Sequence, residues 1–164
     1  MKFWYNKYFW LLVTIVIFAA DRVSKILVAK NLVLNLPLGV FSNFNLFYTQ
    51  NTGAAFSFLN DAGSWHTWLF IVIGMVAICL LVFWELQITA NRWLQFTLAL
   101  ILGGTLGNVF DRVVYGYVID FLDFYFGIWH YPAFNLADSA ICVGAAMLAI
   151  DIFIKRKTTA NTLD

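Results

Sequence analysis

Charged residues are scarce in this chain of 164 residues: they make up 12% of the sequence, with ten Lys and Arg against nine Asp and Glu. The net charge of +1 provides no basic excess for a nucleic-acid backbone, so we expect no nucleic-acid binding. Cysteine is rarer still, and both Cys79 and Cys142 lie in or beside apolar runs. A secreted disulfide framework is therefore disfavoured, and both thiols are predicted to pack as small hydrophobic side chains.

Motifs for a serine nucleophile or a zinc site are also missing. The sequence contains no G-x-S-x-G and no H-E-x-x-H, and its two histidines, His66 and His130, stand alone among aromatic residues. A serine hydrolase with a nucleophile elbow and a zinc protease are therefore disfavoured. We interpret each histidine as a contact to lipid headgroups, the level at which amphipathic rings are enriched.

Apolar sequence is abundant: 62% of the residues are hydrophobic and the mean hydropathy is +0.80. A helix that crosses a membrane needs ~20 mostly apolar residues. Four segments approach this length, at about 9–29, 67–85, 93–112 and 133–155. The sequence therefore predicts a mainly α integral membrane protein, with four transmembrane helices in a single domain that covers residues 1–164.

The orientation follows from basic residues near the ends of these spans, because cytoplasmic loops carry an excess of Lys and Arg. Only Lys30 and Arg112 fall on the side that this rule makes the outside. The opposite side carries six basic residues, namely Lys2, Lys7, Arg92, Lys155, Arg156 and Lys157. Both termini are therefore expected in the cytoplasm.

The two connections on the outer side differ in pattern. Period-two alternation of Phe, Leu and Asn within residues 31–60 predicts a small extracytoplasmic β-sheet. The second connection, about 113–132, is rich in Phe, Tyr and Trp. Such rings settle at the headgroup level, so we expect this segment to lie on the membrane surface as a helix or loop.

Ionisable side chains within a span are costly and by default mark function. In the first span, Asp21 and Lys25 are four residues apart and share a helix face, which favours a structural ion pair. Arg22 lies on another face and is expected to reach outward to the interface.

The third span ends in G-G-T-L-G-N-V-F-D-R, where Gly103 and Gly107 would let another helix approach closely. Asn108 and Arg112 are four residues apart and face one way. Together they could hold a peptide carbonyl or a lipid headgroup. The alternative is that Arg112 and its neighbour Asp111 only anchor the end of the span at the interface.

Asp120 and Asp138 belong to different segments, yet the predicted topology puts both at or just below the outer surface. Two carboxylates held close cannot both ionise easily, so such a pair supplies a base that activates water and an acid that protonates a leaving amine. Asn135, one helical turn before Asp138, could orient the substrate or a carboxylate. Proton relay in a transporter is the alternative use of membrane carboxylates.

In five motifs the sequence resembles the lipoprotein signal peptidases, also called signal peptidase II. Five motifs match in order, and each alone would be weak. They are D-R-V-S-K at 21–25, N-T-G-A-A-F at 51–56, G-G-T-L-G-N-V-F-D-R at 103–112, V-I-D-F at 118–121 and F-N-L-A-D at 134–138.

The resemblance implies a metal-free, cofactor-free aspartic endopeptidase that removes signal peptides from bacterial prolipoproteins before a diacylglyceryl-modified cysteine. It implies a monomer in the cytoplasmic (inner) membrane, in contact with lipid, with its active site at the periplasmic face. The catalytic pair maps onto Asp120 and Asp138. Substrate-binding positions map onto Asn51, Gly53, Asn108, Arg112 and Asn135, and structural support onto Asp21, Lys25 and Asp111.

The residues themselves are also compatible with two other functions. A small proton-coupled transporter would use the same acids as proton sites, distributed through the membrane depth. A non-catalytic assembly protein would need no paired acids. Asn51 and Gly53 also favour a simple turn, which would need no contact with a substrate.

Overall fold

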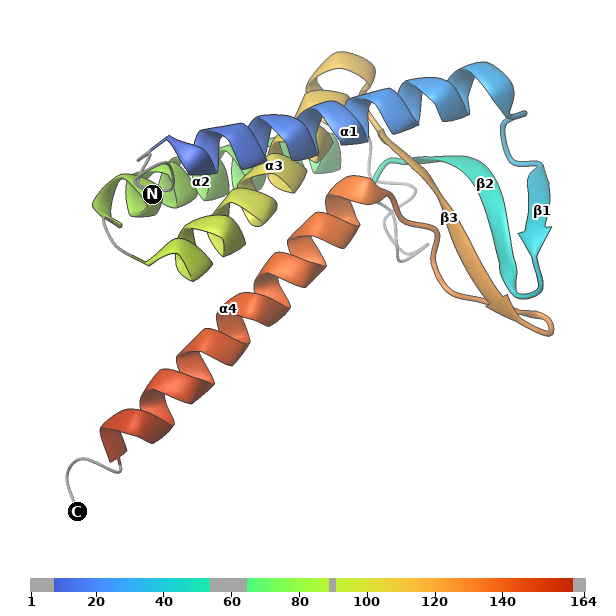
Figure 1. Ribbon diagram of the computed structural model, residues 1–164. Helices are drawn as coiled ribbons and strands as arrows, with labels where there is room; N and C mark the ends of the chain where they lie inside the picture. The colour runs from blue at the N-terminus through green and yellow to red at the C-terminus, as the bar shows by residue number, and fades with distance from the viewer. Residues whose placement is uncertain (1–7, 54–64, 89–90, 161–164) are drawn as a thin grey trace.

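The computed structural model describes residues 8–53, 65–88 and 91–160, with the backbone alone for residues 154–160. Figure 1 shows how its helices and strands are arranged. They are α1 (Phe9–Asn31), β1 (Pro37–Phe41), β2 (Phe44–Asn51), α2 (Trp65–Gln87), α3 (Arg92–Tyr115), β3 (Val118–Phe126), β4 (Trp129–His130) and α4 (Leu136–Ala160).

Three helices are long and apolar enough to cross a membrane: α2, α3 and the part of α4 from Leu136 to Phe153. This confirms a mainly helical, multi-pass membrane protein. Helix α1 is as long as α2, at 23 residues, but it carries Asp21, Arg22 and Lys25 within its apolar sequence. A fourth crossing by α1 therefore stays a prediction.

Helix α3 forms the centre of the helical part and packs against α1, α2 and α4. Within the most apolar window of each helix, 61% of α3 is buried, against 11% for α2 and 17% for α4. The outward faces of α2 and α4 carry large apolar side chains that a bilayer would cover. The Asn91 side chain caps the start of α3 by accepting from the Leu94 amide at 3.1 Å, and Gly116 ends it with φ 82°.

Glycines allow this close packing around α3, as the predicted small-residue motif requires. A Cβ on Gly103 would lie 2.8 Å from Ile17 of α1. A Cβ on Gly104 would lie 2.4 Å from the carbonyl oxygen of Ala137 in the first turn of α4. On Gly107 it would lie 2.4 Å from the Asp21 carboxylate, so these positions leave no room for a side chain.

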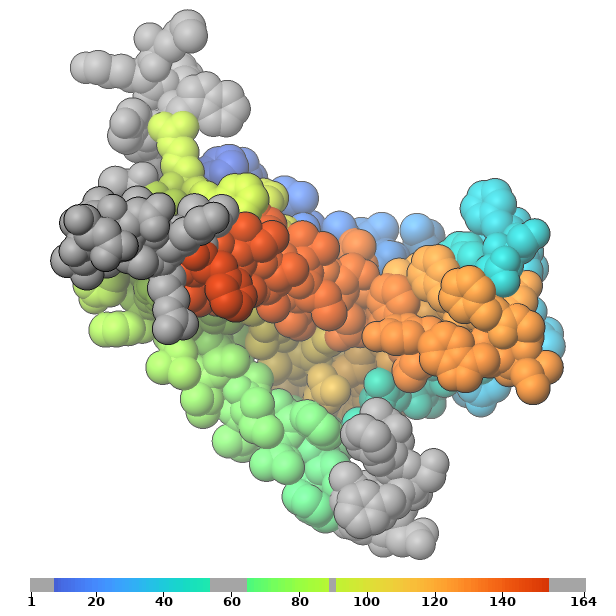
Figure 2. Space-filling model, turned by 90° about the horizontal axis from the view of Figure 1, so that it is seen from below, coloured from blue at the N-terminus to red at the C-terminus, as the bar shows by residue number. Residues whose placement is uncertain are grey.

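The strands form an antiparallel sheet with the order β1-β2-β3-β4. Figure 2 shows the sheet residues gathered at one end of the helices. The first outer connection contributes β1 and β2, which confirms the small sheet predicted there; residues 54–60 of the predicted region lie outside the described residues.

The helix or loop predicted for residues 113–132 was wrong, because most of this segment forms strands; its place at the membrane surface stays a prediction. Helix α3 continues to Tyr115, and β3 then pairs with β2 along its length. Val118, Ile119 and Phe121 of β3 are buried, and the last two pack against Val28 of α1. The sequence V-I-D-F-L-D-F-Y-F therefore belongs to a strand whose first four residues are all buried, so the protein covers both of its faces there.

Candidate active site

The first turn of α4 holds Asp138 in a reciprocal cap. Asn135 precedes the helix, and its side-chain oxygen accepts from the Asp138 amide at 2.9 Å. The Asp138 carboxylate in turn accepts from the Asn135 amide at 3.2 Å. This is the geometry of a capping box, with Asp138 at the third helical position. The motif F-N-L-A-D therefore fixes both the start of the helix and the place of its carboxylate.

Asp120 projects from β3 into the same region and is 1% exposed. One carboxylate oxygen accepts from the Asn51 side chain at 2.8 Å and the other from the Asn135 side chain at 2.7 Å. Burial raises the pKa of Asp120 to about 6; the nearby Asp138 acts in the same direction, while the two asparagine bonds oppose the rise.

Asn135 is the residue that links the two acids. It is fully buried, its amide nitrogen donates to Asp120, and its amide oxygen and backbone N–H engage Asp138. The structure thus brings Asp120 and Asp138 to the two sides of one asparagine, although 18 residues separate them in the sequence.

Asn108 of α3 bonds to the other carboxylate oxygen of Asp138, the one that does not accept from Asn135. Its amide nitrogen donates to Asp138 at 2.7 Å, and its amide oxygen accepts from the Lys25 ammonium at 3.1 Å. Asn135 donates to the same oxygen at 3.2 Å. Because an ammonium can only donate, Lys25 fixes which way the Asn108 amide points and therefore which end of it meets Asp138.

Behind this amide lies a buried cluster of charges. The Lys25 ammonium is 2.8 Å from Asp21 and 2.9 Å from Asp111, and all three side chains are fully buried. The expected pairing of Asp21 with Lys25 is confirmed. The expectation for Arg22 was wrong: it forms an ion pair with Asp111 instead of reaching outward. Asp21 also accepts from the Ala137 backbone amide at 3.0 Å, which ties α1 to the start of α4.

The remaining predicted residues lie at the rim of the network. Gly53 donates its backbone N–H to the Asn51 side-chain oxygen at 2.7 Å and has φ 92°, so the turn that Asn and Gly favour is present. This turn also holds the Asn51 amide toward Asp120. The Arg112 guanidinium lies 4.9 Å from the Phe70 ring centre and donates to the Asn108 backbone carbonyl at 3.4 Å.

Arg112 also borders a cavity of about 330 Å³ between α2 and the end of α3. Its Nε atom is buried and has no hydrogen-bond partner among the described residues. The guanidinium therefore has at least one N–H donor that no described residue uses.

Two polar features were missed by sequence reasoning. The first is the contact of His130 with Asp123 in β3, in which His130 Nδ1 lies 2.9 Å from a carboxylate oxygen. The sequence signal for this contact is the strand pattern of β3 followed by Gly127, which together predict a hairpin that brings His130 back beside Asp123. Glu85 of α2 is 1% exposed, and neither carboxylate oxygen has a partner among the described residues. No sequence spacing singles out Glu85.

Within the part of the chain that is described, no three His, Cys, Asp or Glu side chains gather closely enough to hold a metal ion. The site is thus a set of carboxylates held by asparagine amides.

Comparison with known proteins decides the family. A sequence model for Signal peptidase (SPase) II matches residues 13–154. The chain belongs to the signal peptidase II family. Its relatives include the lipoprotein signal peptidase of Vibrio cholerae serotype O1 (strain ATCC 39541 / Classical Ogawa 395 / O395), 46% identical over 93% of this chain and 91% of that protein. The lipoprotein signal peptidase of Vibrio parahaemolyticus serotype O3:K6 (strain RIMD 2210633) is 48% identical over 91% and 90%.

The fold of this signal peptidase II family member also occurs in solved structures. A bacterial membrane enzyme determined by the in meso method at 2.3 Å resolution superposes with a TM-score of 0.79, at 27% identity over 93% of this chain and 90% of that one. A second, at 1.9 Å resolution, has the same TM-score at 29% identity over 90% and 96%. The chain is thus a membrane-embedded peptidase by family.

Proposed function

We propose that this protein is an aspartic endopeptidase that removes signal peptides from bacterial prolipoproteins, cutting before the diacylglyceryl-modified cysteine. Its relatives are named lipoprotein signal peptidases. The observation that carries the mechanism is the Asn135 side chain, which contacts both Asp120 and Asp138. Its side-chain nitrogen donates to the Asp120 carboxylate, and its side-chain oxygen accepts from the Asp138 backbone N–H, so one asparagine holds the two residues beside each other.

In this mechanism the two acids divide the work of hydrolysis. One carboxylate takes a proton from the attacking water, while the other carboxyl donates a proton to the departing amine. Burial keeps Asp120 titrating at about pH 6, close enough to neutrality for proton exchange during turnover. The two groups interact, so the roles belong to the pair.

The groups around the acids are suited to hold an extended peptide. The Arg112 guanidinium has at least one spare donor that can bind a substrate carbonyl or a lipid headgroup. The Asn51 amide reaches Asp120 from β2, at the edge of the site where a substrate would pass. Asp21, Lys25 and Asp111 lie behind Asn108 and support it without reaching the substrate.

We place this centre at the outer face of the cytoplasmic membrane, with α1 as a fourth span, both termini inside, and the protein acting as a monomer with lipid around it. The charges of α1 can lie in a bilayer because Asp111 and Asp21 neutralise Arg22 and Lys25. The basic residues that set the orientation include Lys2 and Lys7, which lie outside the described residues.

The test is cleavage of a synthetic diacylglyceryl-modified precursor peptide by the purified protein in detergent, without added metal or nucleotide. Asp120→Asn and Asp138→Asn should each lower kcat by at least about 10²-fold, the usual contribution of a general acid or base. Asp151→Asn, a matched change farther along α4, should leave kcat unchanged. Near wild-type cleavage by either dyad variant, at equal expression and membrane insertion, would contradict the proposal.

A proton-coupled transporter is the second candidate, and Glu85 is the observation that favours it. This buried acid lies near the end of α2 away from the sheet. Among the described residues, however, no hydrogen bond connects Glu85 with the network around Asp120. Transport predicts proton movement in vesicles that depends on Glu85 and no cleavage of the precursor, so the same assay separates the two functions.

A further inference from the structure

The segment between the two proposed acids folds as one hairpin. Strand β3 leads away from Asp120, the chain turns at Gly127 with φ 62°, and residues 129–134 return along β3 toward Asn135. The returning segment is bonded to β3 at Tyr131, whose N–H donates to Phe124 at 2.8 Å, and at Phe134, which exchanges two bonds with Leu122 at 2.8 and 3.1 Å. The position of Asn135 therefore depends on the register of this return.

The backbone pairing is regular only near the hairpin tip and at Phe134, which also accepts from the Phe121 N–H at 3.0 Å. Between the bonds at Tyr131 and Phe134, the returning segment has three residue steps where β3 has two, which is a bulge. Pro132 lies in the bulge and has no N–H to donate. The regular pairing of β3 with β4 covers only Tyr125 with His130 and Phe126 with Trp129. Short, interrupted pairings of this kind can slip unless side chains hold them.

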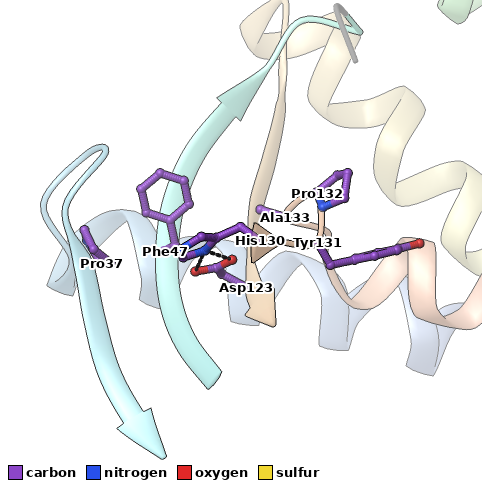
Figure 3. Close-up of a pocket in the computed structure, with 7 residues that line it drawn as sticks. All are labelled: Pro37, Phe47, Asp123, His130, Tyr131, Pro132 and Ala133. Carbon is purple, nitrogen blue, oxygen red and sulfur yellow. Dashed lines mark hydrogen bonds and ion pairs between the residues drawn. The ribbon is translucent and has the colours of Figure 1, made fainter. Parts of the chain in front are cut away.

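A side-chain pair lies at the point where slippage would begin. His130 Nδ1 is 2.9 Å and 3.0 Å from the two carboxylate oxygens of Asp123, and its ring stacks on Tyr125 at 5.2 Å. Asp123 is 3% exposed and also accepts from Asn45 of β2 at 2.9 Å. Figure 3 shows the His130 ring against Asp123. Both residues line a cavity of about 400 Å³. The pair thus connects the returning segment to the two inner strands.

This pair lies on the other side of the sheet from the proposed acids. Side chains alternate along a strand, and Asp123 is three residues beyond Asp120 in the regular strand β3. The extra residue at the irregularity between β2 and β3 belongs to β2, so it does not change that alternation. Neither Asp123 nor His130 can therefore reach a peptide held between Asp120 and Asp138, and any effect on catalysis must pass through the hairpin.

We propose that Asp123 and His130 are positioning residues that lock the register of the hairpin and so keep the Asn135 side chain between Asp120 and Asp138. The inference rests on the peptidase function proposed above. Loss of His130 leaves one oxygen of the buried Asp123 without its protein donor, which makes the paired register costly. Asn135 then shifts relative to β3, and its bond to Asp120 lengthens.

The shift has a specific signature, because the bond from Asn135 lowers the pKa of Asp120. When this bond weakens, the pKa of Asp120 should rise above its value of about 6. Asp138 adds to the rise and Lys25 opposes it, and the Arg112 guanidinium also interacts with Asp120; these charged groups stay in place. A change that only lowers overall stability would not move this pKa.

The experiment measures kcat, KM and the pH dependence of kcat/KM with the lipidated precursor peptide. His130→Ala should lower kcat by about 10- to 100-fold, the range that a small misplacement of a catalytic group produces, with little change in KM. The limb of the pH profile that belongs to Asp120 should move to higher pH. Asn51→Ala identifies that limb, because the Asn51 bond also lowers the pKa of Asp120.

His130→Asn should restore most of kcat, because its amide can donate to Asp123 from nearly the position of Nδ1. Ile128→Ala, at the fully exposed tip of the same hairpin, is the matched control and should behave as wild type. The Asp123→Ala/His130→Ala double variant should lose no more activity than the worse single variant, because the two residues act as one unit.

Unchanged kcat and an unmoved pH limb in His130→Ala, with an active wild type, would overturn the inference and leave the peptidase assignment intact. An inactive wild type would instead overturn the peptidase assignment. In that case the register is read without substrate, from hydrogen exchange at the amides of Tyr131 and Phe134. Exchange should be faster in His130→Ala than in Ile128→Ala, and equal rates would overturn the lock itself.

Discussion

The buried Lys25 ammonium needs no water as a hydrogen-bond acceptor. The ammonium meets the carboxylates of Asp21 and Asp111 and the amide oxygen of Asn108, so its three donors have three acceptors. Arg22 balances the second charge of the cluster through Asp111. The residue that a bilayer tolerates least thereby becomes the support that orients a neighbour of the proposed dyad.

Replacing Lys25 by Met should strongly destabilise the protein. The change keeps the length of the side chain but leaves Asp21 and Asp111 buried with too few partners, at a cost of about 3–5 kcal/mol. Thermal unfolding in detergent should show a clearly lower Tm for Lys25→Met. Lys30→Met, at the exposed end of the same helix, should leave Tm nearly unchanged. Equal Tm values for the two variants would show that the charge cluster is not what supports α1.

Among the elements, α3 is the one that positions the others. Gly104 lies directly under the Ala137 carbonyl, in the turn of α4 that presents Asp138. Gly104→Ala should push this turn away and cost about 1–3 kcal/mol through overpacking. Because Asp138 then moves relative to Asp120, kcat for the lipidated precursor should fall, and KM should change by a smaller factor.

The matched control for this change is Gly39→Ala, where an added Cβ would meet only the Asn45 side-chain oxygen at 3.8 Å. It should retain wild-type Tm and kcat. If Gly104→Ala retained both as well, close packing of α3 on α4 would not be what sets the position of Asp138.

The elements also show what the sequence could predict. Helices followed from apolar length, and the pairing of Asp21 with Lys25 followed from their spacing, because both signals are local. The pair of Arg22 with Asp111 joins residues 89 apart, and no spacing rule connects them. Strand β3 was misread because its aromatic residues also suit a membrane surface; only pairing with β2 distinguishes the two.

The same limit applied within the candidate site. Family motifs brought out Asn108 and Asn135 as substrate residues, and the structure adds that both bond directly to the proposed acids. Which end of each amide meets which oxygen depends on Lys25 and on the helix cap. These contacts arise only after distant segments have packed, so the sequence could not fix them.

At the scale of the whole molecule, the sheet lies at one end of the helices (Figure 1). The proposed dyad joins the two parts, because Asp120 belongs to β3 and Asp138 to the first turn of α4. The orientation proposed above places the sheet end outside the cell and the opposite end of the helices in the cytoplasm. In a variant with Cys79 and Cys142 replaced by Ala, Ile128→Cys should react with a membrane-impermeant thiol reagent in spheroplasts, because Ile128 is fully exposed at the hairpin tip.

The partner experiment uses Gln87→Cys at the last residue of α2, which is exposed at the opposite end. It should react only after the membrane is permeabilised. The reverse pattern, with Gln87→Cys labelled from outside, would invert the proposed orientation and put the dyad on the cytoplasmic side.

The residues that surround the two acids come from α1, β2, α3, β3 and, last in the chain, α4. A nascent polypeptide that stops before Asn135 has Asp120 but neither Asn135 nor Asp138. Such a chain lacks the proposed dyad, so we expect it not to cut neighbouring proteins that leave the insertion machinery beside it. On the proposed mechanism, proteolysis requires that the start of α4 has been synthesised and has packed against α3.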